Sequence, residues 1–340
     1  MTVPSPFRTT LLAFFVLPVL YLVAQPTVAG ASTASTVRSS TASAGCARAA
    51  PPTAVIPGKT AALTLEEGSI GGSYNLTVPS SYRRQHPSPL VLLFYGFGGS
   101  PSQFTTLTEL PPKGAAQGDI VAVPQTQSGE TEWQFSGTGT DGTFVNALVQ
   151  HLEATYCVDP RRVFATGFSA GAAFTIFYGC SHQQQIRAIS TVAVDFQLGC
   201  KQPMPILAFH GTADPLVPYQ NNGVGLSLPG TKVRGTVLNM GDWARLDHCR
   251  PTPVTVRIGS QVTRRQWFGC LSSTSVTLYS IIGGGHDWPG ANPKLGVGLT
   301  TQQISATTLM LRFFAGEGLG GRGGAAGSAA KHVVVSPAQG

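Results

Sequence analysis

A serine stands between two glycines in the segment RVFATGFSAGAAFTIFYGC, which runs from Arg162 to Cys180. β-Branched and aromatic residues precede it, as in a strand, and small, apolar residues at helical spacing follow it. The pentapeptide GFSAG around Ser169 fits the G-x-S-x-G pattern of a nucleophile elbow, in which a sharp strand-to-helix turn exposes the hydroxyl. A bare match also fits an ordinary tight turn, so its chemistry depends on partners elsewhere in the chain.

Segments expected to be strands alternate with segments of helical periodicity. We predict strands over residues 74–79, 89–96, 119–125, 161–169, 188–194, 204–211 and 275–285, and helices over 141–156, 169–180, 231–249 and 300–314. Such alternation predicts an α/β fold with a mostly parallel central sheet, helices on both faces and the active site at the carboxyl ends of the strands. Residues 74–79 alternate apolar and polar side chains, which predicts a half-exposed strand, and Asp141 is predicted as a helix N-cap.

The two ends of the 340-residue chain differ in composition from its middle. Residues 1–31 carry one positive charge, then an apolar run and small residues, which predicts a secretory signal peptide cleaved near Ala31. An uncleaved membrane anchor is the alternative, but Pro18 interrupts the apolar run, which is shorter than the roughly 20 residues a span needs. Residues 32–45 are predicted as a Ser/Thr/Ala-rich linker, residues 46–315 as the catalytic domain, and residues 316–340 as a disordered Gly/Ala-rich tail.

Cysteine content indicates an oxidising environment. The chain has six cysteines, and an even number behind a signal peptide predicts up to three disulfides in a secreted, extracellular protein. No two have the C-x-x-C spacing, which argues against a zinc site, and the spacing leaves the pairing open. No metal or cofactor is expected. The sequon Asn75-Leu76-Thr77 predicts a glycan on Asn75 in a eukaryotic host.

The formal net charge of the chain is +7, yet only 11% of its residues are charged. Nucleic-acid-binding proteins present a dense basic stripe, and no run of Lys and Arg here exceeds two residues. Nucleic acid is therefore not expected as a partner, although the charge is compatible with a weak preference for acidic surfaces.

Asp214 and His286, which come later in the chain than Ser169, are candidates for the partners that a serine nucleophile needs. A serine hydroxyl requires a base, and the base requires an orienting acid, in the chain order Ser, Asp or Glu, His for this kind of elbow. Asp214 follows a predicted strand in FHGTADPLVP, and His286 follows the last predicted strand in IIGGGHDWPG. We predict a Ser169–Asp214–His286 triad. Other candidates, which fit less well by position or chain order, are His151, His182, His210, His248 and Asp287.

The glycine-rich loop after residues 89–96 predicts a second oxyanion donor. Its glycines let the backbone approach a substrate, and we predict that the Phe97 N–H acts with that of Ala170. A turn that only links strand and helix is the alternative. Aromatic rings near a site suit flat ligands such as sugar faces or phenolic rings, so Trp133 and Trp288 are predicted to bind substrate.

Longer segments of the chain resemble the secreted polyhydroxybutyrate depolymerase and feruloyl esterase-like family, grouped with carbohydrate esterase family one. The matching segments are PLVLLFYGFGGS, YCVDPRRVFATGFSAGA, ILAFHGTADPLVPY, WARLDHC and YSIIGGGHDWPG, which run in family order between about residues 74 and 314. The resemblance implies an α/β-hydrolase fold with Ser169 as nucleophile, Asp214 as orienting acid and His286 as base. The family usually has His-Gly where this chain has Tyr95-Gly96, and Tyr95 is predicted to contribute to the substrate pocket.

The resemblance also implies a disulfide pairing. It suggests Cys249–Cys270 and Cys180–Cys200, with Cys46–Cys157 as the pair that remains. Together these features lead us to expect a secreted, monomeric serine esterase, free of the membrane after signal cleavage, that hydrolyses feruloyl or acetyl esters of plant cell-wall xylan through an acyl-enzyme. The alternatives are an extracellular polyhydroxyalkanoate depolymerase and, from another class, a non-catalytic binding protein on a hydrolase scaffold, against which the complete triad argues.

Overall fold

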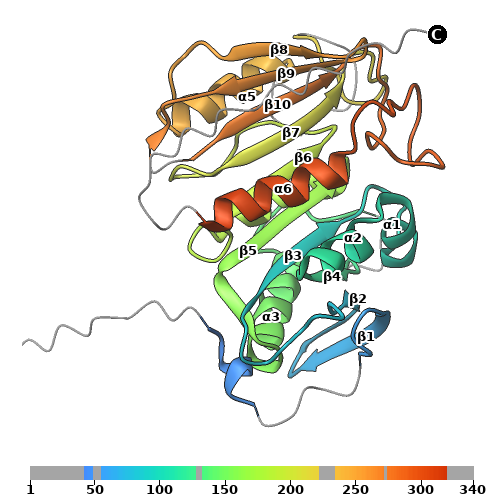
Figure 1. Ribbon diagram of the computed structural model, residues 1–340, viewed down its shortest axis with the longest axis vertical. Helices are drawn as coiled ribbons and strands as arrows, with labels where there is room; N and C mark the ends of the chain where they lie inside the picture. The colour runs from blue at the N-terminus through green and yellow to red at the C-terminus, as the bar shows by residue number, and fades with distance from the viewer. Residues whose placement is uncertain (1–41, 49–54, 128–131, 222–233, 272–273, 320–340) are drawn as a thin grey trace, which may run out of the picture. The chain divides into compact units, whose positions relative to one another are not determined.

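The computed structural model describes residues 42–48, 55–127, 132–221, 234–271 and 274–319. Its central feature is a 10-stranded sheet in the order β1-β2-β4-β3-β5-β6-β7-β10-β9-β8 (Figure 1). The strands are β1 (Thr60–Glu67), β2 (Ile70–Thr77), β3 (Ser88–Phe94), β4 (Ile120–Pro124), β5 (Val158–Phe168), β6 (Ala188–Val192), β7 (Ile206–Gly211), β8 (Val254–Ile258), β9 (Val262–Trp267) and β10 (Val276–Ile281).

Helices follow most of the central strands. They are a short 3-10 turn, η1 (Ala44–Ala47), and α1 (Pro101–Thr108), α2 (Leu110–Gln117), α3 (Thr140–Thr155), α4 (Ala170–Ser181), α5 (Thr236–Leu246) and α6 (Ala306–Leu319). Strands β4, β3, β5, β6, β7 and β10 pair in parallel, and the outer pairs β1–β2, β2–β4, β10–β9 and β9–β8 are antiparallel. The mostly parallel α/β sheet that the sequence predicts is therefore present.

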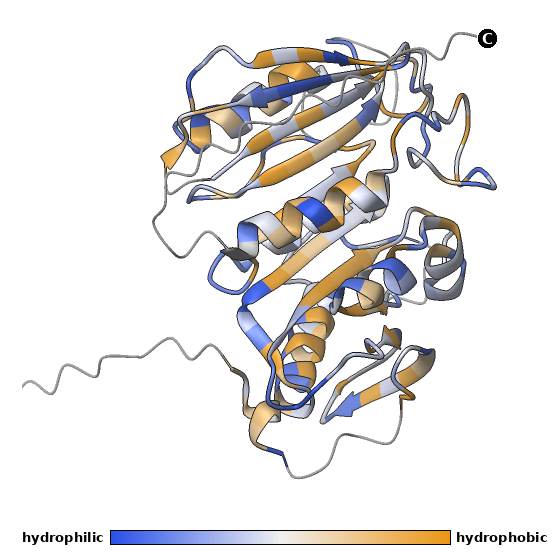
Figure 2. Cartoon of the chain, in the orientation of Figure 1, coloured by the Kyte–Doolittle hydropathy of each residue, from blue (hydrophilic) through white to orange (hydrophobic). Residues whose placement is uncertain are grey.

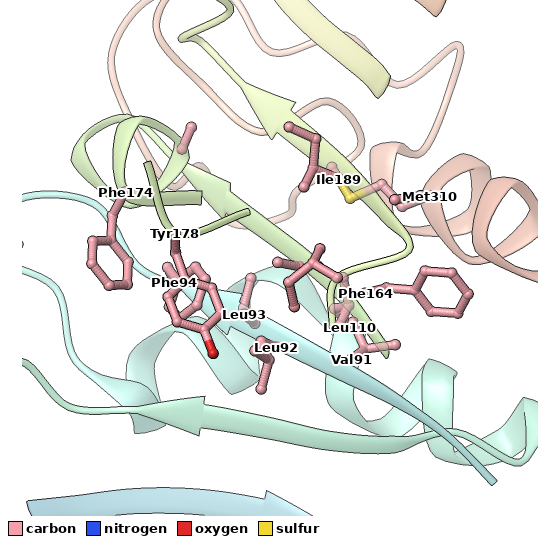
Figure 3. Packing of buried hydrophobic residues seen from close by; sticks show 14 of the residues in the cluster. Val91, Leu92, Leu93, Phe94, Leu110, Phe164, Phe174, Tyr178, Ile189 and Met310 are labelled. Carbon is pink, nitrogen blue, oxygen red and sulfur yellow. The ribbon is translucent and has the colours of Figure 1, made fainter. Parts of the chain in front are cut away.

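Apolar side chains cover both faces of the central strands. In the register of β3 and β5, Val91 lies beside Phe164, so both point to one face, and Phe94, three residues after Val91, points to the other. The Phe94 ring lies 4.8 Å from Phe174 of α4, and the Phe164 ring lies 4.7 Å from Phe314 of α6. Figure 3 shows Phe94 and Phe174 on one side of the strands and Phe164 on the other, and Figure 2 shows β3 and much of β5 as hydrophobic. Helices α4 and α6 thus bury opposite faces of the sheet.

Two local expectations are wrong. The strand over residues 74–79 is buried throughout, because β2 pairs on both edges, with β1 and β4, and contacts α2 and α3. Asp141 is not the N-cap of α3, which is Gly139. The buried Asp141 carboxylate instead accepts backbone hydrogen bonds from Gln127 at 2.7 Å and Gln134 at 2.8 Å, and so fixes the ends of the loop before α3.

A few described residues lie on either side of the predicted catalytic domain, residues 46–315. Residues 1–31, most of the predicted linker and nearly all of the predicted tail lie outside the described residues. Within the linker range, Ser43 is anchored: its backbone N–H donates to Val158 O at 3.0 Å and its hydroxyl donates to Tyr156 O at 2.9 Å. At the other end, α6 continues to Leu319, past the predicted start of the tail.

Three disulfides join distant parts of the chain, in the pairing that the resemblance implies: Cys46–Cys157, Cys180–Cys200 and Cys249–Cys270. The first ties η1 to the residue before β5, and the second ties the end of α4 to the segment before β7. None of the helices in the described ranges is long and apolar enough to cross a membrane.

Candidate active site

Ser169 occupies the sharp turn between β5 and α4. Its backbone dihedrals, φ 55° and ψ −119°, lie in a region that non-glycine residues rarely adopt. The turn is held because the Ser169 N–H donates to Val192 O at 3.0 Å and the Ser169 carbonyl accepts from Ala173 N at 3.0 Å. The predicted elbow is therefore present, and it places Ser169 at the N-terminus of a helix.

Asp214 and His286 meet although they are far apart in the chain. Asp214 follows β7, His286 follows β10, and these neighbouring parallel strands bring Asp214 Oδ2 within 2.8 Å of His286 Nδ1. The other Asp214 oxygen accepts backbone hydrogen bonds from Leu216 and Val217, both at 2.8 Å. The Asp214 side chain has 0% exposure and that of His286 has 4%, so the pair is shielded from water.

The environment of Asp214 keeps it ionised. Burial by itself raises the pKa of the Asp214 carboxyl, but hydrogen bonds from His210 and His286 hold that pKa well below its usual range. An ionised carboxylate can only accept hydrogen bonds, so it requires a proton on His286 Nδ1 and leaves Nε2 of the neutral ring as an acceptor. This is the tautomer that a general base needs.

The loop that carries His286 is held by its neighbour, Asp287. The Asp287 carboxylate accepts backbone hydrogen bonds from Trp288, Leu295 and Gly296 at 2.8 to 3.0 Å, and a further one from the Thr300 hydroxyl. Asp287 thus closes the loop after His286, which agrees with its exclusion as an orienting acid.

Ser169 and His286 line one cavity of about 800 Å³. The His286 ring lies 4.9 Å from the ring of Phe168, the residue before the serine. Among the described residues no hydrogen bond joins the Ser169 hydroxyl to His286, and such contacts are commonly loose in enzymes without substrate. The cavity is rich in aromatic side chains, with polar groups elsewhere on its wall. Its phenylalanines are Phe97, Phe104, Phe135, Phe168 and Phe196, and its polar side chains include Gln103, Glu132, Arg234, Asn239 and Asp242.

The two amides predicted to form an oxyanion hole border this cavity. Phe97 lies in the turn after β3, which is closed by a 3.0 Å hydrogen bond from Gly99 N to Gly96 O, and Ala170 is the first residue of α4. Within the described part of the chain, neither the Phe97 N–H nor the Ala170 N–H donates a hydrogen bond. Both remain available to a ligand. Phe97 is 68% exposed and lines the cavity, so it stands at the cavity mouth.

The predicted substrate contacts of Tyr95, Trp133 and Trp288 are wrong. All three side chains are about 1% exposed and none borders the cavity. Trp133 Nε1 donates to Tyr95 O at 2.8 Å, behind the oxyanion loop, and Trp288 Nε1 donates to Thr307 of α6 at 3.0 Å. Their rings are packed in the core, so these residues stabilise the elements that carry the site and do not contact the cavity.

His210, one of the less suitable candidates by position, lies directly behind the Asp214–His286 pair. Its Nε2 is 3.5 Å from Asp214 Oδ2, and its Nδ1 is 2.6 Å from Asp195 Oδ2. Asp195 follows β6, so another carboxyl end of a parallel strand contributes to the cluster. The position of Asp195 directly after a predicted strand was the sequence signal that could have identified it as a site residue, although no motif contains it.

One further prediction concerns the periphery of the fold. Asn75 is 8% exposed within β2, where its Nδ2 donates to Ser102 at 3.4 Å, so the predicted glycan on Asn75 is sterically blocked in this fold. In the described ranges no group of three His, Cys, Asp or Glu side chains is arranged to hold a metal ion.

The sheet order, the elbow and the Asp214–His286 pair define the class of this protein as an α/β hydrolase. The acetyl xylan esterase from Aspergillus awamori has the same fold, with a TM-score of 0.53 at 14% identity over 76% of this chain and 99% of that one. No family model matches the chain.

Relatives by sequence give the family. The chain is 30% identical over 253 residues to feruloyl esterase C of Emericella nidulans, covering 71% of this chain and 84% of that protein. It is 28% identical over 223 residues to feruloyl esterase B of Piromyces equi, and the match spans only 41% of that protein's length. The chain belongs to the feruloyl esterase B/C-like family of α/β hydrolases.

Proposed function

We propose that this chain is a secreted serine esterase that cleaves carboxylic esters through an acyl-enzyme. The observation that carries the proposal is the buried 2.8 Å hydrogen bond between Asp214 and His286 beside a cavity that also contains Ser169. Family membership supports feruloyl esters of plant cell-wall xylan as the substrate, with acetyl esters as the second choice.

The arrangement gives each residue a role. His286 Nε2 takes the proton from Ser169 Oγ as the oxygen attacks the ester carbonyl, and Asp214 stabilises the imidazolium that forms. The carbonyl oxygen becomes an oxyanion and accepts hydrogen bonds from the N–H groups of Phe97 and Ala170. The tetrahedral intermediate collapses, His286 gives its proton to the leaving alcohol, and the acyl group stays on Ser169.

Water completes the cycle by attacking as the nucleophile, and Ser169 is now the leaving group. It attacks the acyl-enzyme carbonyl while His286 Nε2 accepts one of its protons, and the second intermediate releases the carboxylic acid and returns the proton to Ser169. The aromatic part of the cavity suits the phenolic ring of a feruloyl group, because aromatic rings stack edge to face or offset on one another.

The first test is Ser169→Ala, assayed with methyl ferulate, acetylated xylan and a hydroxybutyrate trimer. We expect hydrolysis of methyl ferulate by the wild type and its loss in the variant. A matched control is Ser181→Ala, at the exposed far end of the same helix, which we expect to leave activity unchanged. Retained activity in Ser169→Ala would contradict the assignment.

The same assay separates the alternatives. The exposed apolar residues Phe97, Leu198 and Leu216 at the cavity would also suit a polyester chain, so preferential cleavage of the hydroxybutyrate trimer would favour a depolymerase. Failure of Ser169 to react with a fluorophosphonate probe would favour a binding protein on a hydrolase scaffold.

Secretion is supported by the three disulfides, which persist in oxidising compartments. N-terminal sequencing of protein recovered from the culture medium should give a start near residue 32. Recovery of uncleaved protein in the membrane fraction would favour the anchor instead.

A further inference from the structure

His210 is buried at the end of β7, between two carboxylates. Its side chain is 1% exposed, and those of Asp195 and Asp214 are 2% and 0% exposed. Asp195 lies on the far side of the ring from Asp214, which in turn contacts His286. The four side chains form a row, Asp195–His210–Asp214–His286, with contacts of 2.6, 3.5 and 2.8 Å.

Both ring nitrogens of His210 face oxygen acceptors. Nδ1 lies 2.6 Å from Asp195 Oδ2, and Nε2 lies 3.0 Å from Val217 O and 3.5 Å from Asp214 Oδ2. The Thr236 hydroxyl, 2.9 Å from Nδ1, can donate or accept. A neutral imidazole carries one N–H and would leave one nitrogen against an acceptor, whereas an imidazolium donates from both.

Asp195 is built in as an acceptor. Its Oδ1 accepts from Asn239 Nδ2 at 2.8 Å, and its backbone carbonyl accepts from Trp243 Nε1 at 3.0 Å, both from α5. Its carboxyl oxygens each face a nitrogen, Oδ1 that of the Asn239 amide and Oδ2 that of His210 Nδ1, so a carboxylate is the form that fits. A buried carboxylate needs a compensating charge, and His210 is the cationic partner in contact with it.

We propose that His210 is a positioning residue of the triad, a buried imidazolium between Asp195 and Asp214 that holds Asp214 ionised toward His286 and offsets part of its negative charge. The proposal rests on the esterase function proposed above. Its chemical consequence is direct: less negative charge beside His286 means that protonated His286 is less favoured. Removing the His210 charge should therefore favour protonated His286.

The electrostatic balance agrees with the hydrogen-bond geometry. Burial by itself lowers the pKa of His210, but the charges and hydrogen bonds of Asp195 and Asp214 raise that pKa to about 10. This direction agrees with the imidazolium form that the contacts of the two ring nitrogens favour.

Other charged and titratable groups around His210 are accounted for. The Tyr219 ring packs edge-on at 5.7 Å, and Arg265 of β9 points to the Tyr219 and Ser280 hydroxyls at 3.3 and 3.0 Å. Arg234 and Asp242 line the cavity and pair with each other at 3.1 Å. None of them supplies the counter-charge that Asp195 and Asp214 receive from His210.

The test is His210→Gln, with kcat/KM for an aryl ester measured from pH 4 to 9. We expect the midpoint of the acidic limb to move up by roughly one pH unit. A residue that only fills space would lower activity or stability at every pH and leave that midpoint in place. The control is His151→Gln, on α3, whose half-exposed side chain contacts Glu67, and we expect its limb to match the wild type.

A second variant protects the test against misfolding. His210→Gln leaves Asp195 buried without a cation, whereas Asp195→Asn combined with His210→Gln removes that orphaned carboxylate. We expect the double variant to be more stable than His210→Gln and to bring the acidic limb back by more than half of the shift. The same midpoint of the acidic limb in the wild type, the single variant and the double variant would overturn the proposal.

An independent readout does not depend on catalysis. In Ser169→Ala labelled with ¹⁵N-histidine, we expect the nitrogen shifts of His210 to show protons on both ring atoms from pH 5 to 9. A neutral His210 in that spectrum would overturn the proposal whatever the activity. Loss of the esterase proposal would instead appear as wild-type protein without Ser169-dependent hydrolysis, with the His210 spectrum unaffected.

Discussion

A methyl group on Gly171 would lie 2.2 Å from the carbonyl oxygen of Phe94, because α4 begins directly against the end of β3. A Cβ on Gly167 would similarly lie 2.4 Å from the Gly171 carbonyl oxygen. Real Cβ atoms do not approach backbone oxygens so closely. Both glycines of the elbow are therefore required by backbone proximity, and this proximity brings the Ser169 turn beside the loop that carries Phe97.

Gly171→Ala should consequently disturb both stability and catalysis. We expect the free energy of unfolding to fall by about 3 kcal/mol, because the added methyl must displace backbone. Activity should fall further than the folded fraction, since the displacement moves Ser169. Urea unfolding followed by tryptophan fluorescence measures the first effect and ester hydrolysis the second.

Gly241→Ala is the matched control for this glycine. A Cβ at Gly241, inside α5, would meet nothing within 4 Å. Alanine there should raise the free energy of unfolding by roughly 0.5 to 1 kcal/mol through helix propensity. Similar effects of the two substitutions would show that close approach is not what the elbow glycines serve.

The sequence predicts the central part of the site well for a physical reason. Ser169, Asp214 and His286 each follow an apolar strand, and parallel strands bring their carboxyl ends to one edge of the sheet. Local patterns therefore locate these residues before any tertiary contact is known. Asp195 and His210 share this position at strand ends, but their contact depends on how the two side chains turn after the strands are assembled.

The failed predictions of substrate contacts have a different cause, the direction of a side chain. Trp288 is two residues after His286, yet its ring turns into the core against α6, so nearness in sequence does not place it in the cavity.

The hairpin β8–β9 was not predicted at all. Its strands are rich in polar and charged residues, including Arg264 and Arg265, because they form one edge of the sheet rather than its centre.

The division between cavity wall and support can be tested with Phe97→Ala and Trp133→Phe. Phe97→Ala removes the ring of a residue that is 68% exposed at the cavity mouth, so we expect a roughly fivefold higher KM for methyl ferulate with little change in stability. Trp133→Phe loses the hydrogen bond to Tyr95 O, so we expect the free energy of unfolding to fall by about 1 to 3 kcal/mol. The reverse pattern would restore Trp133 as a substrate contact.

Asp214→Asn tests the orienting acid. The carboxylate that fixes the His286 tautomer becomes an amide that can also donate, and we expect kcat to fall by about 10³- to 10⁴-fold with KM little changed. Glu109→Gln, which alters only an exposed ion pair with Lys113, should leave kcat unchanged. A loss below tenfold for Asp214→Asn would mean that another group orients His286.

Two buried carboxyls should give opposite dependences of stability on pH. Burial raises the pKa of Asp119 from 3.8 to about 7, against the attraction of Arg162. Between these values the folded protein holds a proton that the unfolded chain has lost. The contribution of Asp119 to the free energy of unfolding is therefore greatest below about pH 4. It declines as pH rises toward 7, by about 4 kcal/mol at most. Asp119→Asn should flatten this decline and make the protein more stable at pH 8.

Asp159→Asn should act in the opposite direction. Burial alone would raise the pKa of Asp159, but hydrogen bonds from Arg161 and Arg162 lower it below 3.8. The stabilisation from Asp159 is present above the pKa of this carboxyl in the unfolded chain. It is lost as pH falls through the pKa in the folded protein, because the unfolded chain takes up the proton first. The variant should therefore be less stable at neutral pH and show a weaker acid decline. Urea unfolding from pH 3 to 8 measures both variants, and curves that shift in parallel with the wild type would contradict both assignments.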